Sequence, residues 1–255
     1  MNGLKLVAYK AIDAITLGRG IERNFHGTPV RFPPRWSRYF KTDYEPETFA
    51  FLRDNLKPGD TFLDIGAHIG LFSVVAARIV GEHGRVVSFE PTPGTRAVMG
   101  EVLRVNGFAG FVEVRAEAVA AKRGTTVFYD SGDEIPVVNS LVRGEQSRNE
   151  FEVQVISLDE FVIENGVKSD CIKIDVEGSE LDLLLGAEKT LSGQQPKILL
   201  SMHPPFIPNG RESIEAIWDI LKKHRYDVSF EGTSVDREWF CSKPELFDVI
   251  LTNAE

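Results

Sequence analysis

Short apolar runs alternate with amphipathic stretches from residue 61 to the end of the chain. Runs rich in Val, Ile, Leu and Phe, bounded by turn-forming residues, predict strands at 61–65, 86–90, 111–115, 171–175, 197–201, 225–230 and 247–252. Apolar residues at helical spacing predict helices at 70–80, 94–105, 179–191 and 212–223. This alternation is typical of an α/β protein with a doubly wound, mostly parallel sheet covered on both faces.

The first part of the chain does not follow this alternation. A short helix is predicted over 4–17, and a second begins near Pro46 and ends before Pro58. We therefore expect an N-terminal, mainly helical cap or extension over 1–57 and one ligand-binding domain over 58–255.

A second irregularity lies in the middle of the domain. Residues 124–130 and 151–156 have the pattern of two paired strands, which predicts an inserted hairpin. The polar segment from Ser131 to Glu150 connects them. It is either a lid over a binding site, with Asn139 and Ser140 in reach of a substrate, or a plain surface loop.

The strand at 61–65 leads into the helix at 70–80 through the turn Gly66-Ala-His-Ile-Gly70. Glycines permit a tight turn and let a ligand approach the backbone, and the helix N-terminus adds unpaired N–H groups. We expect Gly66, His68 and Gly70 to surround a ligand, although His68 could instead only shape the turn. The turn lacks the middle glycine of the dinucleotide fingerprint G-x-G-x-x-G, so NAD is not favoured.

Acids follow at the ends of the first strands. Glu90 comes 24 residues after Gly66, where doubly wound folds place an acid that receives ribose hydroxyls. A ribose-binding acid without a pyrophosphate cradle suits S-adenosylmethionine. Its carboxylate would face the loop N–H groups, and its ammonium group would meet Asp64, directly or through water. Glu117, after the third strand, could approach the adenine, although an exposed carboxylate is an equally good interpretation.

Charged residues also mark the strand predicted at 171–175. Lys173, Asp175 and Glu177 alternate, so they share one side if the strand stays regular. A buried lysine is costly unless it is paired, so Lys173 is expected to pair with an acid. The next strand brings His203 to the same edge of the sheet. We expect these four residues to serve catalysis, with a structural ion pair as the alternative.

The chemistry expected of this group is proton removal from an acceptor hydroxyl. His203 is assigned as the proton acceptor. Asp175 would orient His203 or, together with it, help to bind a divalent cation.

Composition limits the classes of protein that remain. The chain has 255 residues and a net charge of −9, which argues against a general nucleic-acid-binding protein. Its two cysteines cannot form a disulfide framework, and no apolar run approaches the roughly 18 residues of a membrane span. Charged residues interrupt the N-terminal apolar stretch, so a signal peptide is not expected. These features predict a cytoplasmic protein.

Charge is unevenly distributed along the chain. Residues 1–60 contain ten Lys/Arg and seven Asp/Glu, a balance of +3, so the remainder carries −12. Within 19–41, basic residues alternate with aromatic ones. We interpret this segment as a cap whose aromatic side chains pack on the main domain, because such mixtures are common on ordinary surfaces. The alternative is a surface for an anionic or glycosylated acceptor, or for a membrane face.

Three motifs in order resemble one family. Phe62-Leu-Asp-Ile-Gly-Ala-His-Ile-Gly70, Phe89-Glu-Pro91 and Ile174-Asp-Val-Glu-Gly178 are similar to the FkbM-type methyltransferases. Each motif alone is weakly specific, but their order and spacing together are strong. The resemblance covers roughly residues 44–205 and includes Tyr44-Glu-Pro46.

The resemblance implies a class I, S-adenosylmethionine-dependent methyltransferase. Its fold is a Rossmann-like, seven-stranded sheet in the order 3-2-1-4-5-7-6, with the seventh strand antiparallel. Its site places Asp64, Gly66, Gly70 and Glu90 around the cofactor. Many members methylate a hydroxyl of a sugar, glycolipid or natural product, which makes a small molecule or a glycan the expected acceptor. At the end of the fifth strand the family often has the pattern Glu-Ile-His. The matching residues of this chain are Ser201-Met-His203, so Ser201 stands in place of the acid.

Two other functions compete with this one. An NAD-dependent oxidoreductase would need the missing pyrophosphate glycine. A non-catalytic cofactor-binding or scaffold protein would need the glycine turn and Glu90, but not the charged residues on the other side of the same crevice.

Overall fold

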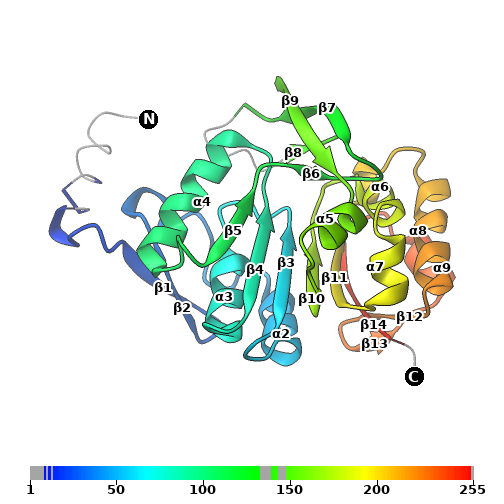
Figure 1. The fold of residues 1–255 in the computed structure, drawn as a ribbon, viewed down its shortest axis with the longest axis horizontal. Coiled ribbons are helices and arrows are strands. Elements are labelled where there is room, and N and C mark those ends of the chain that lie inside the picture. Colours follow the sequence, from blue (N-terminus) through cyan, green and yellow to red (C-terminus); the bar gives the residue numbers. More distant parts are fainter. Residues whose placement is uncertain (1–8, 10, 13, 133–138, 143–147, 254–255) are drawn as a thin grey trace.

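The computed structural model describes residues 9, 11–12, 14–132, 139–142 and 148–253. Its centre is one large sheet (Figure 1). The strands of this sheet are β3 (Thr61–Ile65), β4 (Arg85–Phe89), β5 (Val112–Arg115), β10 (Cys171–Ile174), β11 (Lys197–Met202), β12 (Tyr226–Phe230), β13 (Thr233–Ser234) and β14 (Phe247–Asn253).

The spatial order of these strands is β13-β12-β14-β11-β10-β3-β4-β5. Numbered along the chain, the seven longer strands therefore stand in the order 3-2-1-4-5-7-6. β14 is antiparallel to both of its neighbours, β11 and β12, and the pairs from β11 to β5 are parallel. The sheet has eight strands rather than the expected seven, because the two-residue β13 adds an edge strand too short to leave an apolar pattern.

Helices cover both faces of the sheet. Their bounds are α2 (Pro46–Asn55), α3 (Leu71–Val80), α4 (Pro93–Asn106), α5 (Leu158–Glu164), α6 (Glu180–Leu185), α7 (Glu188–Gly193), α8 (Arg211–Lys223) and α9 (Arg237–Ser242). Strand residues alternate between the two faces, as a pleated strand requires. Leu63 and Ile65 join the core beneath α5 to α9, whereas Phe62 joins the core beneath α2, α3 and α4. The carboxyl ends of the parallel strands remain uncovered by these two layers.

The single helix predicted at 179–191 is wrong. The chain forms α6 and α7 instead, interrupted at Gly186. A Cβ atom at Gly186 would lie 2.1 Å from the carbonyl oxygen of Ala120. This close approach of another backbone segment depends on the tertiary fold, so the apolar pattern does not reveal it.

The N-terminal extension differs from the helical prediction. Residues Ile21–Phe25 (β1) and Thr28–Phe32 (β2) form an antiparallel hairpin, followed by a 3₁₀ turn, Pro34–Trp36, and by α2. Both strands are short and carry charged residues, which hides the alternation of apolar and polar positions. Half of the helix predicted over 4–17 lies outside the described residues, and residues 9, 11–12 and 14–15 of the other half are helical.

The aromatic side chains of this extension pack as the cap interpretation predicts. Phe25, Phe32 and Phe40 are buried in the same core as α3 and α4. Arg35 lies outside, with its guanidinium carbon 4.9 Å from the ring centre of Trp36. The extension therefore covers one face of the sheet and shares its core.

The predicted insertion forms a small second sheet. β7 (Gly124–Asp130) and β9 (Asn149–Ile156) pair antiparallel, as expected, and β6 (Ala118–Val119) and β8 (Asn139–Ser140) extend them to four strands. Figure 1 shows this sheet at the top of the molecule, next to the point where the chain leaves β5. The connection from residue 131 to 150, predicted as a lid or a surface loop, lies largely outside the described residues.

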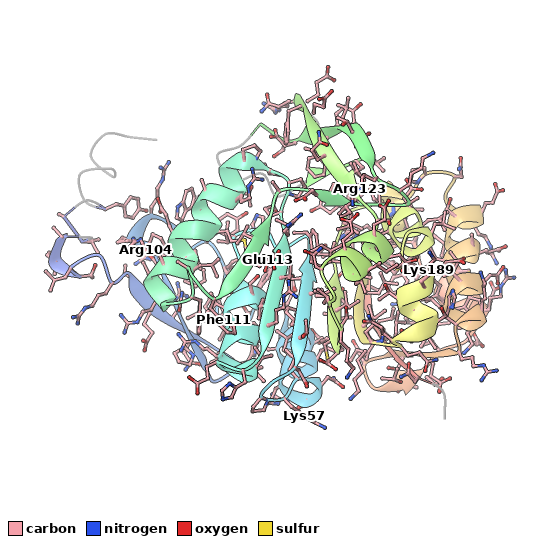
Figure 2. All side chains as sticks on the ribbon, in the orientation of Figure 1. Lys57, Arg104, Phe111, Glu113, Arg123 and Lys189 are labelled. Atoms are coloured by element: carbon pink, nitrogen blue, oxygen red, sulfur yellow. The ribbon has the colours of Figure 1, made fainter. Side chains whose placement is uncertain are left out.

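Side chains fill the layers between these elements, as Figure 2 shows. The labelled Glu113 lies on the edge strand β5 and pairs with Arg85 at 2.8 Å. Within the described part of the chain, no helix combines the length and apolar character that a membrane crossing requires.

Candidate active site

A cavity of about 590 Å³ opens at the carboxyl ends of β3, β4 and β10. The glycine turn and these strand ends form one wall, residues 39–45 of the N-terminal extension form a second, and the inserted sheet contributes Phe128 and Leu141. The predicted site residues that line it are Gly66, His68, Glu90, Glu117, Lys173, Asp175 and Glu177. Asp64, Gly70 and His203 lie outside the lining.

Gly66 cannot be replaced by a residue with a side chain. Its φ of +83° favours glycine, and a Cβ atom there would lie 1.8 Å from the carbonyl oxygen of Asp175. The interpretation from the sequence is that a side chain at Gly66 would both obstruct the ligand and resist the tight turn. The structure shows that it would first strike the neighbouring strand end, so Gly66 holds β3 and β10 close together beneath the cavity.

The N–H groups of this turn are mostly used within the protein. Those of Gly66 and Ala67 donate to the carbonyl oxygen of Phe89 at 3.1 and 3.0 Å, and that of Gly70 donates to the carbonyl of Ala67. The sequence interpretation expected these N–H groups to face the carboxylate of the ligand. Their bonds within the protein show that they do not. Gly70, with φ of +80°, precedes α3 as its N-cap.

Glu90 follows β4 and is 3% exposed. Its two carboxylate oxygens accept hydrogen bonds from the backbone N–H groups of His68 at 3.0 Å and Thr92 at 2.8 Å. Burial raises the pKa of Glu90 to about 7, against the opposing effect of these hydrogen bonds. A carboxylate has about four acceptor positions, so two remain for the hydroxyls of a ribose. This donor and acceptor set fits the adenosine part of the expected cofactor.

The cavity continues from Glu90 toward the inserted sheet. Phe89, Pro91 and Val119 line it there with apolar surface, which is the environment a flat adenine needs. Glu117 lines the same part and pairs with Arg115. It is thus neither a plain exposed carboxylate nor a free acceptor.

His68 connects the glycine turn to the N-terminal extension. Its backbone is left-handed, with φ of 51°. Its ring nitrogen Nε2 lies 3.3 Å from the hydroxyl of Tyr39 and its ring centre 6.1 Å from that of Phe40. His68 therefore lines the cavity and shapes the turn, so both interpretations of this residue apply.

Asp64 does not reach the cavity. Its side chain is fully buried and accepts a hydrogen bond of 2.5 Å from the Ser73 hydroxyl, which in turn accepts one of 2.9 Å from Ser88. Burial raises the pKa of Asp64, opposed by the charge of Lys173 on the neighbouring strand. A direct contact between Asp64 and the cofactor ammonium does not fit this placement, because Asp64 points from β3 toward Ser73 of α3.

Lys173 forms the ion pair that the sequence predicts. The side chain is 2% exposed, and its Nζ atom lies 2.8 Å from Oδ2 of Asp175. Burial would raise the pKa of Asp175, but the charges of Lys173 and His203 prevail and lower it. Burial would lower the pKa of Lys173, but Asp175 and other nearby acids prevail and raise it. The strand ends at Ile174, so Glu177 reaches the cavity through a turn with φ of 47°.

His203 lies behind Asp175. The residue is 7% exposed; Nδ1 donates to Oε1 of Glu180 at 2.8 Å, and Nε2 lies 3.5 Å from Oδ1 of Asp175. Burial disfavours the charged imidazolium, but the hydrogen bond to Glu180 and the charges of Asp175, Glu180 and Glu177 prevail and raise the pKa of His203 to about 9. A base needs the neutral form, so the proton-acceptor role predicted for His203 does not fit its surroundings.

We expect the His203 ring to titrate near pH 9 rather than at its ordinary value of 6.5. Because the folded-state pKa is raised, the stabilisation from this proton is complete below about pH 6.5 and is lost as the pH rises to about 9. Long-range ¹H–¹⁵N NMR, with His203→Asn for assignment, measures the midpoint. Glu180→Gln should move it downward, and a wild-type midpoint between 6 and 7 would restore His203 as a base.

No group of three or more His, Cys, Asp or Glu arranged to hold a metal ion occurs within the described ranges. The divalent cation that was one alternative for Asp175 and His203 therefore has no support in this geometry. The two residues that would bind it are bonded to Lys173 and Glu180 instead.

Sequence reasoning missed several residues of the site. Tyr39, Tyr44 and Glu45 line the cavity from the N-terminal extension. Glu180, the partner of His203, is fully buried at the start of α6. The motif Tyr44-Glu-Pro46 was a sequence signal for the residues of the N-terminal extension. For Glu180, the signal was its position two residues after Gly178.

A family model and a solved structure both name the FkbM methyltransferases. The sequence model described as the methyltransferase FkbM domain matches residues 64–228. Over 215 residues, the chain is 27% identical to AMB antimetabolite synthetase AmbE from Pseudomonas aeruginosa, a match that covers 68% of this chain and 10% of AmbE. A solved structure of methyltransferase FkbM from Methylobacillus flagellatus KT has a TM-score of 0.50 at 17% identity, covering 80% of this chain and 50% of that one.

The chain thus spans a tenth of the length of this curated relative and half of the solved FkbM chain. At 17% identity, the solved structure bears on the fold alone, and it agrees with the α/β architecture described above. The family match covers more than half of the chain and includes the glycine turn, Glu90 and the strand end at Asp175. The chain therefore belongs to the FkbM family of S-adenosylmethionine-dependent methyltransferases.

Proposed function

We propose that this protein transfers a methyl group from S-adenosylmethionine to a hydroxyl of a sugar, a glycolipid or a natural product. One observation carries the proposal. A single cavity has the buried acid Glu90, which suits ribose hydroxyls, at one end and the charged pair Lys173–Asp175 at the other, with the glycine turn between them.

Residues at the first end would hold the cofactor. Glu90 has acceptor positions left for two ribose hydroxyls, and the apolar surface of Phe89, Pro91 and Val119 suits the adenine. Bound S-adenosylmethionine supplies a methyl group on a positively charged sulfur, which makes that carbon electrophilic without further activation by the protein.

Asp175 would position the acceptor and take its proton. Its Oδ2 atom is bonded to Lys173, while Oδ1 belongs to a side chain that lines the cavity. A hydroxyl that donates a hydrogen bond to Oδ1 is held in one orientation. Its proton becomes strongly acidic as the oxygen gains a carbon substituent, so even a carboxylate with a lowered pKa is a sufficient base when it is correctly placed.

His203 acts on this carboxylate from behind. Together with Lys173 it surrounds Asp175 with positive charge, and Glu180 fixes the orientation of its ring. His203 is a positioning residue in this proposal. Glu177 lines the cavity beside Asp175 and supplies a further hydrogen-bond acceptor for a polyhydroxy acceptor.

The alternatives explain less of the site. An NAD-dependent oxidoreductase needs a pyrophosphate cradle, and the position of its middle glycine is occupied by His68. A non-catalytic binding protein needs no buried lysine paired with an aspartate at the end of the cavity away from Glu90. The name of the relative AmbE, an antimetabolite synthetase, supports natural-product hydroxyls among the acceptors to be tried.

The test is a screen of hydroxyl acceptors with S-adenosylmethionine that carries a deuterated methyl group. Mass spectrometry of the products locates the label, which we expect on oxygen. Asp175→Asn should lower turnover by about 10²-fold or more while cofactor affinity stays unchanged. A label on nitrogen or carbon would contradict O-methylation, and an Asp175→Asn enzyme with wild-type turnover would remove Asp175 from the chemistry.

A further inference from the structure

The position of Glu90 determines where the amino-acid end of the cofactor must lie. With the ribose at Glu90 and the adenine against Val119, the remainder of the molecule extends to the other side of the glycine turn. That side of the cavity is lined by Leu71 and Phe72 in the first turn of α3, and by residues at the end of β10. An acid at this end of the cavity would pair with the ammonium group of the cofactor.

Glu45 occupies this region. It precedes α2 and lines the cavity. The neighbouring Tyr44 ring stacks on Phe72 with 6.3 Å between ring centres, and the Nζ atom of Lys173 lies 5.4 Å from the same Phe72 ring. Glu45 thus lies in the group of side chains that surrounds the start of α3, the region where Asp64 was expected.

The backbone at Glu45 is strained. Its φ of 40° and ψ of 62° are left-handed, a conformation that non-glycine residues rarely adopt and that concentrates at functional sites. As the N-cap of α2, Glu45 makes no side-chain capping bond. Instead, its carboxylate accepts hydrogen bonds from the hydroxyls of Thr48, at 3.0 Å, and Tyr44. The strain turns the carboxylate toward the cavity.

The charge of Glu45 lacks a dedicated partner. None of the ion pairs within the described ranges includes it, and the nearby Lys173 is bonded to Asp175. Burial raises the pKa of Glu45, and Lys173 opposes this only in part. A half-buried carboxylate with hydroxyl neighbours gains most from a bound cation, because a charge-assisted hydrogen bond replaces part of its lost hydration.

We propose that Glu45 binds the α-ammonium group of S-adenosylmethionine and of its demethylated product. This inference rests on the proposed cofactor and assigns to the N-terminal extension a part of the cofactor site. It also explains why the extension is placed over the cavity: binding the cofactor would fix Tyr44 and Glu45 at the start of α3.

Calorimetry with three ligands tests the assignment without knowledge of the acceptor. S-adenosylhomocysteine has both the ammonium and the carboxylate, decarboxylated S-adenosylmethionine keeps only the ammonium, and 5′-methylthioadenosine has neither. Glu45→Gln should weaken the first two by about 10- to 100-fold and leave the third within about twofold. Thr48→Val, which removes an orienting hydroxyl, should weaken the same two to a smaller extent.

Glu90→Ala is the matched control, because it should weaken all three ligands alike. Equal affinity of wild type and Glu45→Gln for S-adenosylhomocysteine would overturn the inference, as would an equal loss for all three ligands. A loss confined to S-adenosylhomocysteine would assign Glu45 to the carboxylate end and also overturn it. If the wild type binds none of the ligands, the proposed cofactor itself is wrong, which is a distinguishable result.

Discussion

Replacing Gly66 with alanine is expected to lower the free energy of unfolding by at least about 3 kcal/mol, because it combines overpacking with a disfavoured backbone conformation. The new Cβ atom would lie 1.8 Å from the carbonyl oxygen of Asp175, an atom of the backbone that cannot rotate away. β3 and β10 must then separate, which moves the turn and Asp175 together. Urea unfolding followed by circular dichroism measures the loss.

Gly59→Ala separates the two causes. Gly59 has a comparable φ of +92°, but no atom lies within 4 Å of the position that a Cβ atom would take there, so only the backbone cost of about 1–2 kcal/mol applies. If both variants lose the same amount, the contact with Asp175 is not what excludes a side chain at Gly66. A folded Gly66→Ala protein is expected to bind S-adenosylhomocysteine poorly, since the turn and the strand end at Asp175 cannot both keep their positions.

Replacing Lys173 with methionine is expected to cost about 3–5 kcal/mol of stability, because it leaves buried acids without their cation. Lys173 is bonded to Asp175, and its charge also lowers the pKa values of Glu45 and Asp64. Methionine fills a similar volume, so the loss reports on charge rather than on a cavity. Thermal and urea unfolding at several pH values measure it.

The loss should depend on pH in a defined direction. Without Lys173, the pKa values of the remaining acids rise in the folded state above their values in the unfolded chain. The folded variant then binds more protons, so its stability falls, relative to wild type, as the pH rises from about 5 to 8. Lys173→Met combined with Asp175→Asn should recover part of the stability. Lys197→Met, on the adjacent strand β11, is the control; a loss as large as that of Lys173→Met would contradict the charge argument.

Strand positions were predictable because they depend on local sequence. β3 was predicted at its observed bounds, Thr61–Ile65, since a fully buried strand is a short apolar run between turn signals. The hairpin of β1 and β2 was missed because charged residues interrupt short, partly exposed strands. Gly186 interrupts a predicted helix for a reason that lies in another segment of the chain, the backbone of Ala120.

The site residues were likewise predictable where they depend on local sequence, and not where they depend on contacts between distant segments. Glu90, Lys173 and Asp175 were predicted because they follow or occupy strands whose carboxyl ends meet at one edge of the sheet. The pairing of Lys173 with an acid was predicted as well, but the partner of His203 was not. Glu180 reaches His203 from a different element, and this contact raises the pKa of His203, which disfavours the expected role as a base.

By itself, the sequence determined the seven longer strands of the main sheet, the turn at Gly66 and the strand ends that carry Glu90 and Asp175. It did so because apolar period, turn chemistry and charge are properties of neighbouring residues. Only the tertiary structure decided which of these groups face the cavity. Asp64 and Glu45 are both acids near the start of a helix in the sequence, yet packing buries the first beneath α3 and exposes the second to the cavity. Side-chain burial and protonation depend on contacts between distant segments, and those contacts exist only in the folded chain.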